Sequence, residues 1–367
     1  MTMGRVRSLA GVCCFAIGSA LGAQEATVPP SIDTLLAQEG RAYEQARQAA
    51  LERPDLVGDA RAALAGWEYG PATWRRLVLT EALSMHLDHP EEADTLRNLS
   101  GLDRDHYRHR RKPGPSVDRE LGGLRHVAPL MVELFLKGVE TYEWSSPETA
   151  DAEAAALRRG LLMAVGESGH AASVHFLIDV VEGGCLCCAS CDAALRALGE
   201  TGDLRALPVL LRALSGARAE AKTGEIALVV SALGGVRHDE VWPHIRVELS
   251  NPDRLVREAA IRSAADFANR WHWRADPVRG ERVRATVGSA LMDVLLETEE
   301  QGLVAALLES LGLVATPQLR DLLDQRLGDR PGRRPSGSSA AEAERVRRAL
   351  ERVDRALGRQ QPRERER

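Results

Sequence analysis

The sequence predicts an all-α protein, an α-solenoid of stacked helical hairpins. Three observations predict this fold class: a segment that recurs at near-constant spacing, a glycine that keeps its place in each copy, and apolar residues three or four positions apart. One hairpin of two short helices cannot bury its apolar stripes, whereas hairpins stacked in a row bury them against each other. We expect this array over residues 151–328.

The recurring segment is clearest as ALGETGDLRALPVLLRAL. Its copies align on a shared glycine column and lie at 164–181, 197–214, 232–249 and, more weakly, 310–327. Gly166 and Gly199 are 33 residues apart, and Gly234 follows 35 residues after Gly199. The stretch PDRLVREAAIRSAADFA, 252–268, reads as the first helix of another copy.

Segment 197–214 shows the expected unit, a helix, a tight turn and a second helix. We expect Gly199 to end the first helix, because glycine accepts the left-handed backbone of a helix stop. Asp203 is the N-cap candidate for the second helix. Pro208 is expected within the first turns of that helix, where its missing N–H matters little.

A family resemblance rests on these residues. The pattern VR-x-x-A, followed by A-L-G-x-x-G-D-x-x-A-x-P-x-L, resembles HEAT repeats of the short bacterial type also found in phycobilisome lyases. It stands here as Val256-Arg257-x-x-Ala260 and as ALGETGDLRALPVL over 197–210. The resemblance covers roughly 150–328 and implies a right-handed stack of helix pairs with a concave face, used as a scaffold or binding surface. It carries no bilin chemistry, because no lyase-specific residues map onto this chain.

The N-terminus predicts export. Residues 1–23 contain two arginines, a short apolar run and small residues before a cleavage point near Ala23, the layout of a signal peptide. The apolar run is too short to span a bilayer. Cleavage would remove Cys13 and Cys14, so we expect a protein of the bacterial periplasm or the extracellular space, with no stable membrane anchor after cleavage.

Composition narrows the function classes. The net charge is −5, so no basic excess supports nucleic-acid binding by the body of the protein. Arginine provides nearly all of the positive charge, a bias typical of GC-rich bacterial genomes. The chain has no GxSxG, HExxH, Walker-type or CxxCH motif. We therefore expect a protein that is not an enzyme and has no resident cofactor.

Local patterns predict the remaining regions. Residues 24–150 read as a helical region, either degenerate repeats that cap the array or a separate domain, with a long polar loop at 99–122. Residues 329–339 have the composition of a linker. Residues 340–367 are expected to form a C-terminal amphipathic helix followed by a disordered tail, QQPRERER.

Four cysteines fall within seven residues. They are Cys185, Cys187, Cys188 and Cys191. Alignment with 252–268 places them in the turn between two hairpins and in the first turn of the next helix, where a thiolate is stabilised by the helix N-terminus.

Three interpretations of the cysteine cluster stay open. Disulfides are favoured in an exported protein, paired as 188–191 with 185–187 or as 185–188 with 187–191. The four thiolates could instead bind Cu or Zn, although structural zinc sites usually draw ligands from separated segments. A reactive redox pair is the third interpretation.

Two histidine pairs and one aromatic loop complete the candidate sites. If both HxxH pairs faced one pocket they could bind zinc or nickel; otherwise they are solvated. The pairs are His86 with His89 and His106 with His109. The loop joins residue types common in binding hot spots, so it could contact a partner, or its tryptophans could seal an irregular hairpin. Its residues are Trp271, His272, Trp273 and Arg274.

These observations predict a non-enzymatic exported scaffold that binds a protein or peptide partner through the repeat surface. The alternative is an envelope thiol or metal protein that uses the cluster at 185–191 for metal binding or redox chemistry.

Overall fold

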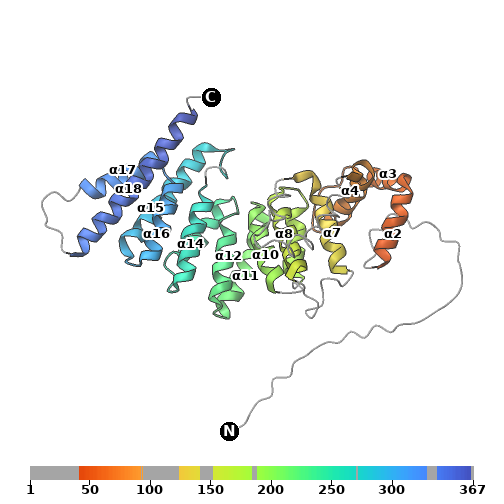
Figure 1. Ribbon diagram of the computed structural model, residues 1–367, viewed down its shortest axis with the longest axis horizontal. Helices are drawn as coiled ribbons and strands as arrows, with labels where there is room; N and C mark the ends of the chain where they lie inside the picture. Colours follow the sequence, from red (N-terminus) through yellow and green to blue (C-terminus); the bar gives the residue numbers. More distant parts are fainter. Residues whose placement is uncertain are drawn as a thin grey trace, which may run out of the picture.

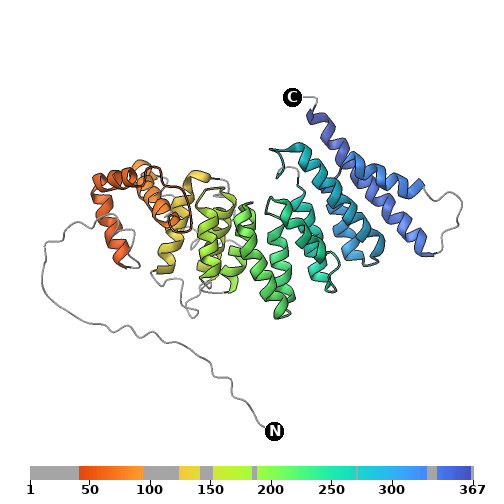
Figure 2. The ribbon, with the colours of Figure 1, turned by 180° about the vertical axis from the view of Figure 1, so that it is seen from behind.

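The computed structural model describes residues 41–91, 93, 124–140, 152–183, 188–269, 272–328 and 337–364. Across these ranges the chain forms helices joined by turns and short loops, and contains no β-strand. The predicted all-α fold class is therefore confirmed. Figures 1 and 2 show the helices arranged along the long axis of the molecule in chain order, from α2 at one end to α18 at the other.

The N-terminal part is a small group of packed helices. They are α2 (Arg41–Glu52), α3 (Pro54–Ala63), α4 (Trp74–Asp88), the 3-10 turn η1 (Arg125–Val127) and α7 (Ala128–Glu140). Helix α4 contacts α2, α3, α7 and α9. The indole Nε1 of Trp74 donates a hydrogen bond of 2.8 Å to Asp179, which joins α4 to α9. The predicted loop at 99–122 lies outside the described residues.

Beyond α7, alternate helices of the chain pack against one another and form a first row. This first row consists of α8 (Ala152–Glu167), α10 (Cys188–Glu200), α12 (Thr223–Leu233), α14 (Arg254–Phe267) and α16 (Gln301–Leu313). The first row carries much of the core, with leucines such as Leu161, Leu198 and Leu233 almost wholly buried.

The intervening helices form a second row. It consists of α9 (Ser173–Glu182), α11 (Leu207–Ala219), α13 (Trp242–Glu248), α15 (Pro277–Glu297) and α17 (Pro317–Gly328). Two 3-10 turns lead into this row, η2 (Leu204–Ala206) before α11 and η3 (Asp239–Val241) before α13. The last helix, α18 (Gly337–Glu364), packs against α15, α16 and α17 and so lies at the end of both rows.

Three glycines, two within helices and one directly after α12, permit the close packing of the first row. A Cβ atom built on Gly166 would lie closer than 3.0 Å to backbone atoms of Ala197 in α10. The same holds for Gly199 and Ala232 of α12, and for Gly234 and Ser263 of α14. The same contact therefore joins each neighbouring pair among four helices of the first row, α8, α10, α12 and α14.

The prediction that Gly199 ends its helix with a left-handed backbone is wrong. Helix α10 continues through Gly199 to Glu200, and the left-handed residue of this turn is Gly202, with φ of +68°. Gly199 is needed because the backbone of α12 lies against it. The other turn predictions are confirmed: the Asp203 side chain accepts a hydrogen bond from the backbone N–H of Arg205, and Pro208 lies in the first turn of α11.

The C-terminal helix is longer than expected. Helix α18 begins at Gly337, within the predicted linker, and continues to Glu364, through most of the segment predicted to be a disordered tail. Its apolar residues Val346, Ala349 and Val353 are buried, which agrees with the predicted amphipathic stripe. Packing of that stripe on α16 and α17 provides the stabilisation that a polar tail lacks by itself. Within the described residues, no helix is long and apolar enough to cross a membrane.

Candidate functional sites

A groove crosses three neighbouring helices of the first row. We call it the α12 groove, and it encloses about 360 Å³. It is lined by Asp192 and Arg196 of α10, by Gly224, Ala227, Leu228 and Ser231 of α12, and by Leu255, Glu258, Ala259 and Arg262 of α14. The α12 residues are spaced three and four apart, so they share one face of that helix.

Small side chains on α12 create the groove. In the glycine-column alignment, position 192 of α10 corresponds to 227 and 258, and position 196 corresponds to 231 and 262. Helix α12 therefore has alanine and serine where α10 and α14 have Asp with Arg and Glu with Arg. The groove therefore has charged side chains of α10 and α14 as its two walls and small residues of α12 as its floor.

The charged residues of the two walls differ in whether they form ion pairs. On α14, the Arg262 guanidinium donates to Glu258 at 2.7 Å. On α10, Asp192 and Arg196 are exposed and make no ion pair within the described part of the chain. Leu255 is 53% exposed at the α14 edge, so the groove combines apolar surface with charges of both signs.

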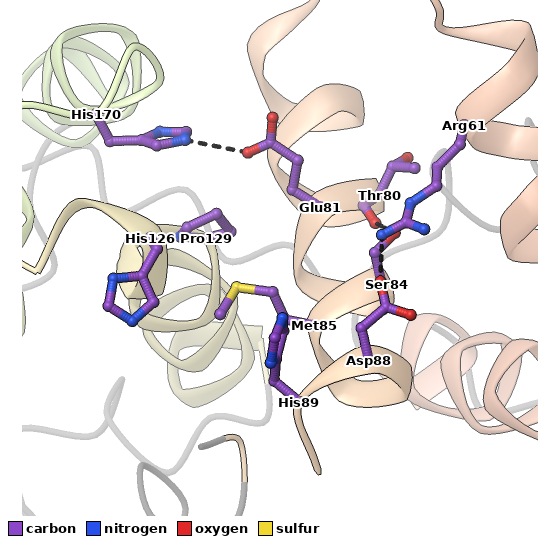
Figure 3. Close-up of a pocket in the computed structure, with 10 residues that line it drawn as sticks. All are labelled: Arg61, Thr80, Glu81, Ser84, Met85, Asp88, His89, His126, Pro129 and His170. Carbon is purple, nitrogen blue, oxygen red and sulfur yellow. Dashed lines mark hydrogen bonds and ion pairs between the residues drawn. The ribbon is translucent and has the colours of Figure 1, made fainter. Parts of the chain in front are cut away.

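A second cavity lies between α4, the start of α7 and the turn between α8 and α9 (Figure 3). It encloses about 290 Å³, and its lining includes three histidines, His89, His126 and His170. The His170 ring is held on both sides: its Nδ1 accepts from the backbone N–H of Ala172 at 3.2 Å, and its Nε2 lies 3.1 Å from Glu81.

Two further polar residues of this cavity, Arg61 and Ser84, are also engaged. Arg61 pairs with Asp88 at 2.5 Å, as Figure 3 shows. The Ser84 hydroxyl donates to the carbonyl of Thr80 at 2.9 Å, so it is used within its own helix. The hydrogen bond of Ser84 is therefore not made to a neighbouring base that could activate it as a nucleophile.

The structure separates the members of the HxxH pair that it describes. His86 is buried beside a carboxylate, with Nε2 2.6 Å from Glu133, and Arg47 lies 3.6 Å from the same carboxylate. His89 is exposed and lines the cavity of Figure 3. His106 and His109 lie outside the described residues. No group of three or more His, Cys, Asp or Glu side chains in the described ranges is placed to hold a metal ion.

The cysteine cluster is described only in part. Helix α10 begins at Cys188, so Cys188 and Cys191 lie in its first turn, as the alignment predicted. Cys191 is half-buried. Cys185 and Cys187 lie outside the described residues, so the disulfides and their pairing stay a prediction.

The aromatic loop packs inward at its second tryptophan. Trp273 is 6% exposed, and its Nε1 donates to the carbonyl of Phe267 at 2.8 Å. Its ring meets Phe267 edge to face at 5.7 Å, so Trp273 seals the end of α14 and is not free to contact a partner. Trp271 lies outside the described residues.

The two remaining loop residues have contrasting environments. Arg274 is exposed. Burial, and then the charge of Arg237, lowers the pKa of His272 to about 4. The Nδ1 atom of His272 is buried and has no hydrogen-bond partner within the described residues. A neutral, enclosed imidazole of this kind contributes packing and offers little to an incoming partner.

Comparison with known proteins adds no assignment. No protein-family model matches the chain, and none of the curated proteins matches it.

Proposed function

We propose that this protein is an exported, non-enzymatic α-solenoid of HEAT-like repeats that binds a protein or peptide partner through its repeat surface. The α12 groove is the proposed contact site. The observation that carries the proposal is the position of this groove across three successive helices of one row, α10, α12 and α14.

The recurring glycine contacts support the repeat arrangement. Each fixes the distance between one helix of the first row and the next, so the same face of successive helices forms one surface. Such a surface is open to solvent along its length, which suits an extended polypeptide better than a small substrate that must be enclosed.

The chemistry of the groove indicates which segment it would accept. The floor of Gly224, Ala227 and Ser231 leaves room for an apolar side chain against Leu228 and Leu255. The free charges of Asp192 and Arg196 are available to a segment with charges of both signs. We therefore propose an extended peptide in which charged residues flank a central apolar residue.

A matched pair of glycine substitutions tests the site. Gly224 and Gly216 are both exposed helical glycines, and a Cβ atom built on either has no atom within 4 Å, so no neighbour obstructs the first atom of a new side chain at either position. Only Gly224 lines the groove. Peptides selected from a displayed library on the wild-type protein should bind Gly224→Tyr at least about tenfold more weakly, and Gly216→Tyr unchanged. Equal binding to both variants contradicts the groove as the site.

The alternative function is an envelope thiol or metal protein that uses the cluster at 185–191. It is supported by the place of Cys188 and Cys191 in the first turn of α10, where thiolates are stabilised. Two measurements distinguish disulfides, bound metal and reactive thiols at this cluster. They are intact mass before and after reduction and alkylation, and elemental analysis of natively purified protein. Four thiols alkylated without reduction exclude the disulfides, and stoichiometric Cu or Zn establishes the metal protein.

A further inference from the structure

A third site, separate from the α12 groove and the histidine-lined cavity, lies on the other side of α14, between the start of α13 and α15. We call it the Trp242 pocket, and it encloses about 320 Å³, a volume within the range of small-ligand sites. It is lined by Asp239, Trp242, Phe267, Arg279, Arg282, Val283, Thr286 and Val287. None of these residues lines the α12 groove, so the pocket is independent of the proposed peptide site.

The floor of the pocket is apolar and aromatic. Trp242 and Phe267 stack with ring centroids 6.2 Å apart and planes inclined by 8°. Trp273 holds Phe267 from the edge, so the rings are fixed before any ligand arrives. Phe267 and Val287 are buried, so the apolar surface within reach of a ligand comes from the half-buried Trp242 of α13 and Val283 of α15. A flat apolar ring fits this surface with little reorganisation.

The rim of the pocket is positively charged. Arg279 is held by Asp239 at 2.8 Å and lies 5.2 Å from the ring centroid of Trp273. Arg282 is exposed, and its guanidinium has no partner within the described residues. Arg279 is thus neutralised by Asp239, with Asp276 also nearby, and Arg282 is the guanidinium of the rim that stays available to a ligand.

We propose that the Trp242 pocket binds an aromatic carboxylate, with the ring against Trp242 and Val283 and the carboxylate on Arg282. Guanidinium groups pair with carboxylates through two parallel N–H donors, which gives a preference for the anion over its neutral amide. The ligand is either a free aromatic acid or the C-terminal residue of a polypeptide, since both carry this chemistry.

Titration calorimetry with N-acetyl-phenylalanine and its neutral amide tests the proposal. The acid should bind, and the amide should bind at least about tenfold more weakly. Arg282→Ala should weaken binding of the acid by about tenfold, while Arg274→Ala, which removes an exposed arginine outside the pocket, should leave it unchanged. Thermal unfolding of both variants confirms that they are folded; Arg282 is exposed, so no loss of stability is expected.

A peptide arm distinguishes the two sources of the ligand. A short peptide ending in phenylalanine with a free carboxylate is compared with the same peptide amidated at its end. Tighter binding of the free-acid peptide than of N-acetyl-phenylalanine supports a polypeptide terminus, and the reverse order supports a free acid. The proposal is overturned if the acid and amide bind equally, if Arg282→Ala has no effect, or if no acid binds up to about 10 mM.

Discussion

Replacing Gly199 by alanine perturbs the contact on which the first row of helices depends. The added Cβ would lie closer than 3.0 Å to the carbonyl oxygen, carbonyl carbon and Cα of Ala232. These are backbone atoms of α12 and cannot rotate away, so the two helices must separate. Overpacking typically costs about 1–3 kcal/mol, with backbone obstruction at the upper end. The higher helix propensity of alanine offsets at most about 1 kcal/mol. We expect the free energy of unfolding to fall by about 2 kcal/mol.

The matched control is Gly216→Ala in α11. Gly216 is also helical, but nothing lies within 4 Å of its Cβ position, so alanine should raise the free energy of unfolding by about 0.5–1 kcal/mol. Urea titrations followed by far-ultraviolet circular dichroism measure both changes. Ala232→Gly should not rescue Gly199→Ala, because the obstructing atoms belong to the backbone. A stability gain in both alanine variants would refute the reasoning.

Three further predictions concern buried polar groups. Glu133→Ala removes the carboxylate that lies 2.6 Å from His86 and 3.6 Å from Arg47, and should cost about 3 kcal/mol in urea titrations, since one partner of the buried Arg47–Glu133 ion pair is lost. Ser263→Ala removes a 2.6 Å hydrogen bond from the buried hydroxyl to the carbonyl of Val230 and should cost about 1 kcal/mol by the same assay. His272 has a folded pKa lowered to about 4, so only the unfolded ring takes up a proton below about pH 6.5. Stability should therefore be complete above about pH 6.5 and fall by about 1–2 kcal/mol towards pH 4, allowing for partial exposure of the ring; His272→Gln should lack this loss.

The features predicted correctly from the sequence are those set by neighbouring residues. Asp203 caps its turn because its side chain reaches an N–H two residues ahead, and Pro208 fits the first helical turn because its own backbone needs no hydrogen bond there. The helix start at Cys188 followed from the alignment with 252–268. The first two depend on a few consecutive positions, and the third on the comparison of two copies of the repeat.

The features that sequence reasoning missed depend on contacts between distant segments. Gly199 looked like a helix stop, but its requirement comes from α12, more than thirty residues away. The sequence left open whether Trp273 contacts a partner or seals an irregular hairpin, and only the distant packing decides this: its indole N–H donates to the carbonyl of Phe267.

The α12 groove could have been found in the aligned copies. Alanine and serine occupy columns 227 and 231, where the flanking helices carry charges. The signal becomes visible only when equivalent positions of successive helices are compared. The Trp242 pocket had no comparable signal, because its lining residues come from four different elements, η3, α13, α14 and α15, and not from equivalent positions of the repeat.

Removal of one repeat tests the central claim most directly. Deleting residues 199–233 joins Leu198 to Gly234 and leaves two glycine contacts in place, Gly166 with Ala197 and Gly234 with Ser263. A row stabilised by neighbours should tolerate this loss, with unchanged circular dichroism per residue and cooperative unfolding in urea. Deleting only α12 and the turn before it, residues 220–233, should unfold or aggregate the chain, because α11 loses its partner. If the whole-repeat deletion is as disruptive as the half-repeat deletion, the helices share one indivisible core and the account is wrong.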